Sequence, residues 1–81
     1  MNEIVRASIQ SSCIASVGYS GATKTLEVEF SSGAVYRYFE VSYETHGAFM
    51  SAASKGSYFN RHIKGRHREA RQPLPSSQVG R

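Results

Sequence analysis

The chain has 81 residues, 40% of them hydrophobic, which fits one small folded domain and excludes wholesale disorder. Its one cysteine excludes an internal disulfide and a zinc site built on several thiolates. The net charge of +4 is uneven, because residues 1–54 hold three basic and five acidic side chains whereas residues 55–71 hold six basic and one acidic. A basic end on a slightly acidic body predicts an interaction region at that end.

No apolar run approaches the ~18 residues of a membrane span, and the first residues, "MNEIVRASIQ", lack the apolar core of a signal peptide. A lone cysteine is typical of a reducing compartment. We therefore expect a soluble cytoplasmic protein.

Strand patterns fill the first half of the chain. Residues 1–11 form a lead-in or a short extra strand at "EIVRASI", and a strand is expected next at 13–20, "CIASVGYS". A turn containing Gly21 leads into 25–30, "TLEVEF", where apolar Leu26, Val28 and Phe30 alternate with polar residues as in a half-buried strand. Residues 34–39, "AVYRYF", form the next strand.

The loop between these last two strands sets their register. A three-residue loop, Ser31-Ser32-Gly33, ends on the glycine that its left-handed position favours. The predicted pairs are Phe30 with Ala34, Val28 with Tyr36, Glu27 with Arg37 and Leu26 with Tyr38. This register turns both tyrosines toward the core and leaves Arg37 on the open face, whereas a two-residue turn would mix the faces. Tyrosines exposed on the sheet would instead form a base-stacking platform.

A first helix is expected at residues 41–56. Ser42 is its predicted N-cap, and Gly56 is its predicted end. Phe49, Ala52 and Ala53 form its apolar stripe at helical spacing.

A second helix is expected after Ser57, which caps it, with Phe59 and Ile63 turned inward. If this helix continues through Gly65, one outward stripe collects four basic residues. These are Arg61, Lys64, Arg68 and Arg71. Residues 72–81, "QPLPSSQVGR", contain two prolines and no periodicity, and predict a flexible C-terminal tail.

The predicted fold is therefore α+β, a three- to four-stranded antiparallel meander followed by two short helices packed on one face. Residues 12–71 form the predicted domain, between the lead-in 1–11 and the tail 72–81.

Three segments of the chain, "IASVGY", "TLEVEFSSGAVYRYF" and "AFMSAASKGSYFNRHIKGR", together resemble the KTSC domain family. The resemblance runs from about Ser12 to Arg68 and includes the family's central YxY motif, here Tyr36-Arg37-Tyr38, and the more specific string "SKGSYFN" at 54–60. Two turn positions depart from the family pattern. Ser42 follows Val41 where the family often has proline, and Ser20 stands where it often has aspartate. The resemblance implies no established activity, but the family's attachment to some lysyl-tRNA synthetases implies RNA as a ligand.

The basic segment is the first candidate for a binding site. The expected phosphate contacts are Arg61, Lys64, Arg66 and Arg68, with Lys55, Tyr58 and Arg37 at the margin. Phosphates neutralised by Lys and Arg release counterions, and a tyrosine stacks on an unpaired base. The favoured function is a small non-enzymatic nucleic-acid-binding module, with tRNA-like or single-stranded RNA preferred to DNA. The alternative interpretation of these residues is an ordinary solvated face.

Two further functions fit the sequence. A protein-interaction module, such as a phage or mobile-element accessory protein, would use the basic segment to bind an acidic host protein surface. A structural appendage would dimerise through an open sheet edge, so the chain is expected as a monomer or a weak homodimer. A basic stripe running from the second helix to Arg37 would favour nucleic acid, and an exposed apolar patch would favour a protein partner.

Catalytic and metal sites are not expected. His62 and His67 diverge on a helix, and with His46 they lack the carboxylates that would complete a metal site. Cys13 has no neighbouring base to activate it, and the sequence has no nucleophile elbow or phosphate-binding glycine loop. We expect no enzyme activity, no cofactor and no small-molecule substrate. Asn60 is interpreted as a residue that caps a turn or bonds to the local backbone, and the alternative is that it binds a ligand or a base edge.

Overall fold

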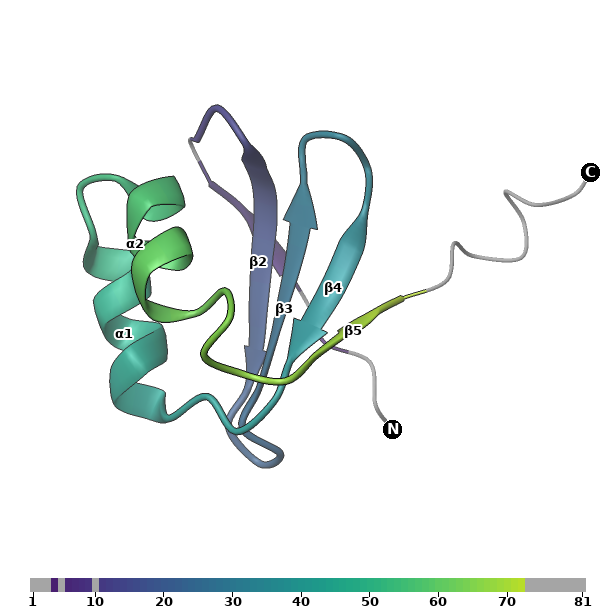
Figure 1. The fold of residues 1–81 in the computed structure, drawn as a ribbon, viewed down its shortest axis with the longest axis vertical. Helices are drawn as coiled ribbons and strands as arrows, with labels where there is room; N and C mark the ends of the chain where they lie inside the picture. Colours follow the sequence, from purple (N-terminus) through teal and green to yellow (C-terminus); the bar gives the residue numbers. More distant parts are fainter. Residues whose placement is uncertain (1–3, 5, 10, 73–81) are drawn as a thin grey trace, which may run out of the picture.

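The computed structural model describes residues 4, 6–9 and 11–72, and they form one antiparallel sheet and two helices (Figure 1). The sheet has five strands in chain order, which is a simple meander. The strands are β1 (Arg6–Ser8), β2 (Ile14–Ser20), β3 (Thr25–Phe30), β4 (Val35–Tyr38) and β5 (Glu69–Arg71). The helices α1 (Tyr43–Ser51) and α2 (Lys55–His62) lie between β4 and β5 in the chain and on one side of the sheet. The predicted α+β class is confirmed.

The hairpin between β3 and β4 has the predicted register. Glu27 lies opposite Arg37, and Val28 lies opposite Tyr36. The amide of Phe30 donates to the carbonyl of Ala34 at 2.9 Å, and this bond closes the three-residue loop. Gly33 has a φ of +98°, a conformation that side chains with a Cβ rarely adopt. The glycine in this loop is therefore required by the backbone.

The core lies between the helices and one face of the sheet. Strands β2 to β4 contribute buried aliphatic and aromatic side chains, α1 contributes Phe49 and α2 contributes Phe59. The full set is Ile14, Val17, Leu26, Val28, Tyr38, Val41, Phe49, Phe59 and Ile63. The inward orientation that the sequence predicted for Phe59, Ile63 and Tyr38 is confirmed.

The boundary between the two helices differs from the prediction. The hydroxyl of Ser42 accepts from the amide of Thr45, as its predicted role as N-cap requires. However, α1 ends at Ser51, and Ala52 is already extended, so the predicted stripe of Phe49 with two alanines is wrong. Ser54 caps α2 by accepting from the amide of Ser57 at 3.3 Å. Because this cap starts the helix at Lys55, Gly56 lies within α2. The prediction that Gly56 ends the first helix is therefore wrong.

The chain does not continue as a helix beyond His62. Gly65 has a φ of +79°, and the backbone turns there toward the sheet. Residues 69–71 then pair with β4, and Arg71 lies opposite Tyr36. The amide of Gln72, the first residue of the predicted tail, donates to the carbonyl of Val35 at 2.7 Å; residues 73–81 lie outside the described residues. The predicted helical stripe of four basic residues is therefore wrong, because a left-handed glycine and strand pairing end the helix early.

The other face of the sheet carries a buried carboxylate. Glu27 accepts hydrogen bonds from Arg37 at 2.7 Å and from Arg6 at 3.0 Å. Gly18 lies between Arg6 and Glu27 in the row of paired residues, and without a side chain there Arg6 can reach across β2. The predicted pair of Glu27 and Arg37 is thus present, but strand β1 adds a second arginine, and the two cover Glu27 so that only 7% of it is exposed.

Candidate nucleic-acid interface

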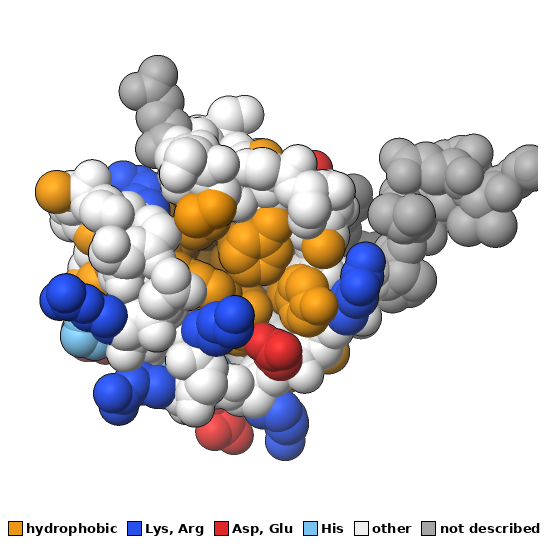
Figure 2. Space-filling model, turned by 45° about the horizontal axis from the view of Figure 1, so that its top comes forward, with side chains coloured by type: hydrophobic (Ala, Val, Ile, Leu, Met, Phe, Trp, Pro, Cys, Tyr) orange, Lys and Arg blue, Asp and Glu red, His pale blue; other side chains and the backbone are white. Residues whose placement is uncertain are grey.

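Five of the six basic residues of the segment 55–71 follow one another closely in the chain, on three consecutive elements. Arg61 belongs to the last turn of α2, Lys64, Arg66 and Arg68 belong to the connection that follows, and Arg71 belongs to β5. All five are exposed. In Figure 2, Lys and Arg side chains border a hollow of hydrophobic side chains. We call these five residues the basic surface.

The charges of the basic surface are not neutralised within the described chain. The only salt bridges between described residues are those of Arg6 and Arg37 with Glu27. Arg66 donates to the carbonyl of Arg61 at 2.8 Å, and the guanidinium of Arg68 lies 5.3 Å from the ring centroid of Phe39. These contacts hold two side chains in place but leave their positive charge available to an anion.

Two residues predicted at the margin of the site have other contacts. Arg37 points to the opposite face of the sheet from Tyr36 and Tyr38, where it contacts Glu27, so a stripe from α2 to Arg37 is not formed. Tyr58 is half-buried between Phe49 and His62, with ring centroids 6.0 and 4.4 Å away. Tyr58 therefore has part of its ring in the core.

Lys55, the third marginal residue, lies at the start of α2. Its ammonium donates to the carbonyl of Ala52 at 3.3 Å. This bond satisfies a backbone oxygen in the short link between the helices. Lys55 remains at the opposite end of α2 from Arg61 and stays a marginal candidate.

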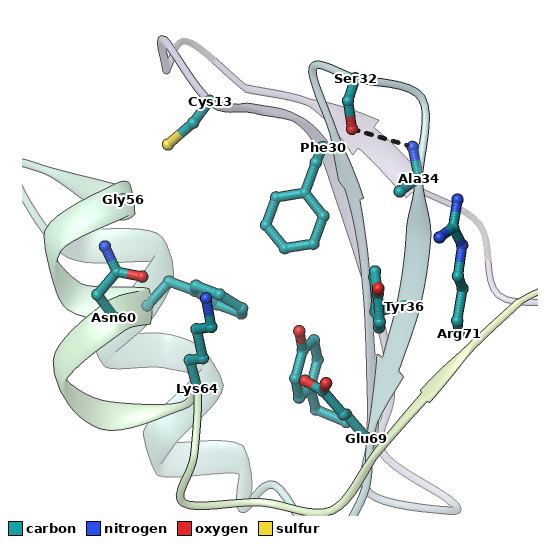
Figure 3. Close-up of a pocket in the computed structure, with 12 residues that line it drawn as sticks. Cys13, Phe30, Ser32, Ala34, Tyr36, Gly56, Asn60, Lys64, Glu69 and Arg71 are labelled. Atoms are coloured by element: carbon teal, nitrogen blue, oxygen red, sulfur yellow. Dashed lines mark hydrogen bonds between the residues drawn. The ribbon is translucent and has the colours of Figure 1, made fainter.

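A pocket of about 600 Å³ opens beside the basic surface (Figure 3). It lies between α2 on one side and the β3–β4 hairpin with β5 on the other. Its floor is aromatic, and its rim carries polar and charged groups. The floor is Phe30, Tyr36, Tyr38 and Phe59, and the rim includes Cys13, Ser32, Asn60, Lys64, Glu69 and Arg71. Two cations of the basic surface, Lys64 and Arg71, thus also line the pocket.

The aromatic floor is a connected set of rings. Phe30 meets the rings of Tyr36 and Phe59 edge-on, at centroid distances of 5.9 and 5.4 Å. Tyr38 is 2% exposed and packs edge-on against Phe59 at 5.2 Å. Tyr36 is half-buried, so its ring is shared between the core and the pocket. The tyrosines therefore face the core side, as predicted, and Tyr36 also offers aromatic surface to a ligand.

Among the described residues, Glu69 is the one acidic group that lines this pocket. Its side chain points into the space between α2 and the sheet (Figure 3). Burial, and then the hydrogen bond and negative charge of Glu69, raise the pKa of Tyr38 well above its ordinary value of 10.0. The phenol of Tyr38 therefore stays protonated.

The sequence did not reveal the pocket because its far wall is β5, and the three residues "EAR" are too few to indicate a strand by their pattern. The sequence also did not reveal that α2 closely approaches the start of β2, at the other end of the pocket. A Cβ placed on Gly56 would lie 3.0 Å from the sulfur of Cys13, so the glycine lets α2 pack near the start of β2. The available signal for this approach was Gly56, two residues after the cap Ser54, but the sequence predicted Gly56 as the end of the first helix.

The remaining candidate residues are separate from each other. His46 stacks on Tyr19, His62 packs on Tyr58, and Nδ1 of His67 lies 3.1 Å from the carbonyl of Phe39. No cluster of three or more metal-ligating side chains occurs among the residues that the structure describes. Asn60 is exposed and lines the pocket. Of the described helices, none is long and apolar enough to cross a bilayer.

The comparisons with known proteins agree with this fold. The model of the KTSC domain matches residues 10–67. The chain belongs to the KTSC domain family. The KTSC domain protein of Yersinia pestis has the same fold in its crystal structure, with a TM-score of 0.85 and 35% identity over 88% of this chain and 100% of that one.

Relatives of this KTSC domain occur both alone and within an enzyme. An uncharacterised protein of Stutzerimonas stutzeri is 47% identical over 62 residues, which are 76% of this chain and 87% of that protein. A lysine–tRNA ligase of Nostoc punctiforme is 42% identical over 57 residues, which are 70% of this chain but only 10% of the ligase. The domain is thus related to a small region of the ligase and not to the bulk of that enzyme.

Proposed function

We propose that this KTSC domain binds RNA through the basic surface. The observation that carries the proposal is the exposure of five cations on adjacent elements without an ion pair to any described carboxylate. A cluster of this kind concentrates positive potential, which attracts a polyanion and holds it by counterion release. The net charge of residues 55–71, six basic against one acidic, gives the domain its positive end.

RNA is proposed ahead of DNA because of the domain's relatives. The related region in the lysine–tRNA ligase of Nostoc punctiforme belongs to a protein whose name states tRNA as a substrate. An appended basic domain would raise the local concentration of the enzyme's polyanionic substrate by a second contact. A stand-alone copy would bind RNA by the same contacts with lower affinity.

Binding by such a surface is expected to be weakly selective. Arg and Lys contacts to phosphates position a nucleic acid without reading its sequence. The contacts proposed are Arg61, Lys64, Arg66, Arg68 and Arg71, with Lys55 and Tyr58 at the margin. Arg37 is assigned to the support of β3 and β4, because it contacts Glu27 on the other face of the sheet.

The exposed apolar patch that would favour a protein partner is not prominent. Among the large hydrophobic side chains of the described residues, the widely exposed one is Tyr43, on α1. The aromatic rings beside the basic surface lie inside the pocket. An acidic protein surface remains the partner to be sought if RNA does not bind.

The test is fluorescence anisotropy of labelled tRNA, single-stranded RNA and duplex DNA at several salt concentrations. The variant Arg61/Lys64/Arg66/Arg68→Ala changes four exposed side chains and should fold. We expect micromolar binding that weakens with salt, and a salt slope that falls by up to about 3 in the variant, at ~0.7 per lost contact. Lys24→Gln, an exposed cation outside the segment, is the matched control. Absence of binding by the wild type below about 100 μM at ~50 mM salt contradicts the proposal.

A further inference from the structure

We propose that the pocket between α2 and β5 holds one unpaired base of the bound RNA. This inference rests on the proposed function and adds to it, because the basic surface alone would bind any phosphate backbone. The pocket adjoins that surface and shares Lys64 and Arg71 with it. A strand that contacts the basic surface would therefore pass the mouth of the pocket.

The floor of the pocket suits a planar aromatic ring. Phe30 and Tyr36 are both half-buried, and their rings meet nearly at right angles, at 75°. Such a corner offers one ring face and one ring edge to a base, which are the two geometries that aromatic groups prefer. Stacking of unpaired bases on aromatic side chains is the common means by which proteins hold single strands.

The rim of the pocket places positive charge where a phosphate would lie. In Figure 3, Lys64 rises from the end of α2 into the space between the helix and the sheet. On the opposite wall, the guanidinium of Arg71 lies 6.0 Å from the ring centroid of Tyr36. A base on the floor would thus have a cation on either side for its flanking phosphates.

Glu69 restricts the orientation of this ligand. Its carboxylate lines the pocket near Tyr38 and repels phosphate, so the phosphates must stay at the rim. A base or a ribose carries N–H and O–H groups that can donate hydrogen bonds to a carboxylate. The charge pattern therefore favours a nucleotide that enters base first. The volume of about 600 Å³ lies in the range of pockets that enclose small ligands.

The deciding experiment compares two RNAs with the same phosphates. One is a single strand of about eight nucleotides, and the other is the abasic strand of equal length, which keeps the sugar-phosphate backbone and lacks the bases. The basic surface would bind both strands. If one base stacks in the pocket, loss of the bases should weaken binding by about five- to 150-fold, the ratio that corresponds to the energy of one base–aromatic stack.

Two protein variants assign the difference to the pocket. Tyr36→Leu removes an aromatic face and keeps apolar bulk, and it should weaken the base-containing strand while leaving the abasic strand unchanged. Tyr43→Leu is the matched control, because Tyr43 is 73% exposed on α1, outside the pocket. Lys64→Gln should weaken both strands, because Lys64 contributes charge.

A second measurement needs no aromatic substitution. Cys13 is the only cysteine of the chain, it is exposed, and it lines the pocket. The base-containing strand should slow the alkylation of Cys13 in the wild-type domain more than the abasic strand does, when each strand is at saturating concentration.

The outcomes separate the two proposals. Equal, salt-dependent binding of both strands, with equal alkylation of Cys13, overturns the pocket inference and leaves RNA binding by the basic surface in place. A Tyr36→Leu variant that weakens both strands equally also overturns it, because the effect is then structural. A wild-type domain that binds neither strand overturns the proposed function and the pocket inference together.

Discussion

Arg71 lies over the ring of Tyr36, with its guanidinium carbon 6.0 Å from the ring centroid, because β5 pairs with β4 and places the two residues opposite each other. Cross-strand partners point to the same side of a sheet. A strand that follows both helices thereby returns a cation to the helix-covered face. Strand β5 thereby forms the far wall of the pocket and adds Arg71 to the basic surface.

Arg71→Gln should lower the affinity for single-stranded RNA and reduce the magnitude of the salt slope by about 0.7, the loss of one phosphate contact. The substituted side chain is exposed, so the fold should persist. Anisotropy titrations at four or more salt concentrations give the slope, with Lys24→Gln as control. An unchanged slope for Arg71→Gln would remove this residue from the basic surface.

Glu27→Gln should destabilise the domain by about 1–3 kcal/mol, because two arginines then lose their buried counter-charge. Glu27 contacts both Arg6 and Arg37. The free energy of unfolding from urea denaturation measures the change. The control is Glu44→Gln in the first turn of α1, where loss of a favourable helix-dipole contact costs only ~0.5 kcal/mol. Equal effects for the two variants would contradict a structural role for the arginine–glutamate cluster.

Two glycines should respond in opposite directions to alanine. Gly33→Ala should destabilise the domain by about 1–2 kcal/mol, because its φ of +98° strains any residue with a Cβ. Gly47→Ala should stabilise it by up to ~1 kcal/mol, because Gly47 lies within α1 and a Cβ there would meet no atom within 4 Å. Thermal or urea denaturation of the two variants tests the pair. Destabilisation by Gly47→Ala would show that α1 is packed differently.

Acid should destabilise the domain through His46. Burial lowers the pKa of His46 from its ordinary 6.5, and its Nδ1 is buried without a hydrogen-bond partner among the described residues. Below pH 6.5 the unfolded chain therefore binds more protons at this position than the folded one, so stability is complete above that pH and falls as the pH is lowered. His46 stacks on Tyr19 at 4.3 Å.

His46→Phe keeps the ring stack and removes the titration. The free energy of unfolding of this variant should vary less between pH 7 and about pH 5 than that of the wild type. Urea denaturation at each pH gives both curves. Parallel curves for the two proteins would show that His46 is not the source of the acid sensitivity.

Much of the sheet followed from local sequence rules. Alternation in 25–30 and a glycine in the left-handed position of the loop were enough to place Glu27 opposite Arg37. These signals are local, since a hairpin register depends only on its turn and on the faces of its two strands. The same alternation placed Tyr38 in the core.

The second half of the chain depends on contacts that the sequence does not display. Ser54 and Ser57 are both suitable N-caps, and only the packed structure shows that Ser54 is used. Strand β5 has only three residues, too few to predict a strand from their pattern, so its pairing with β4 is a tertiary effect. Composition therefore located the cations of 55–71, but it could not show that Lys64 and Arg71 meet at one pocket.

The most direct test of the central proposal is amide chemical-shift mapping of the isotope-labelled domain during titration with single-stranded RNA. We predict salt-sensitive shifts concentrated in 61–71, with further shifts at 30–36 where the hairpin borders the pocket. The Glu27 face, including Arg6 and Arg37, should change little. Shifts confined to that opposite face, or no shifts at about 50 mM salt where even non-specific binding is strong, would contradict RNA binding by the basic surface.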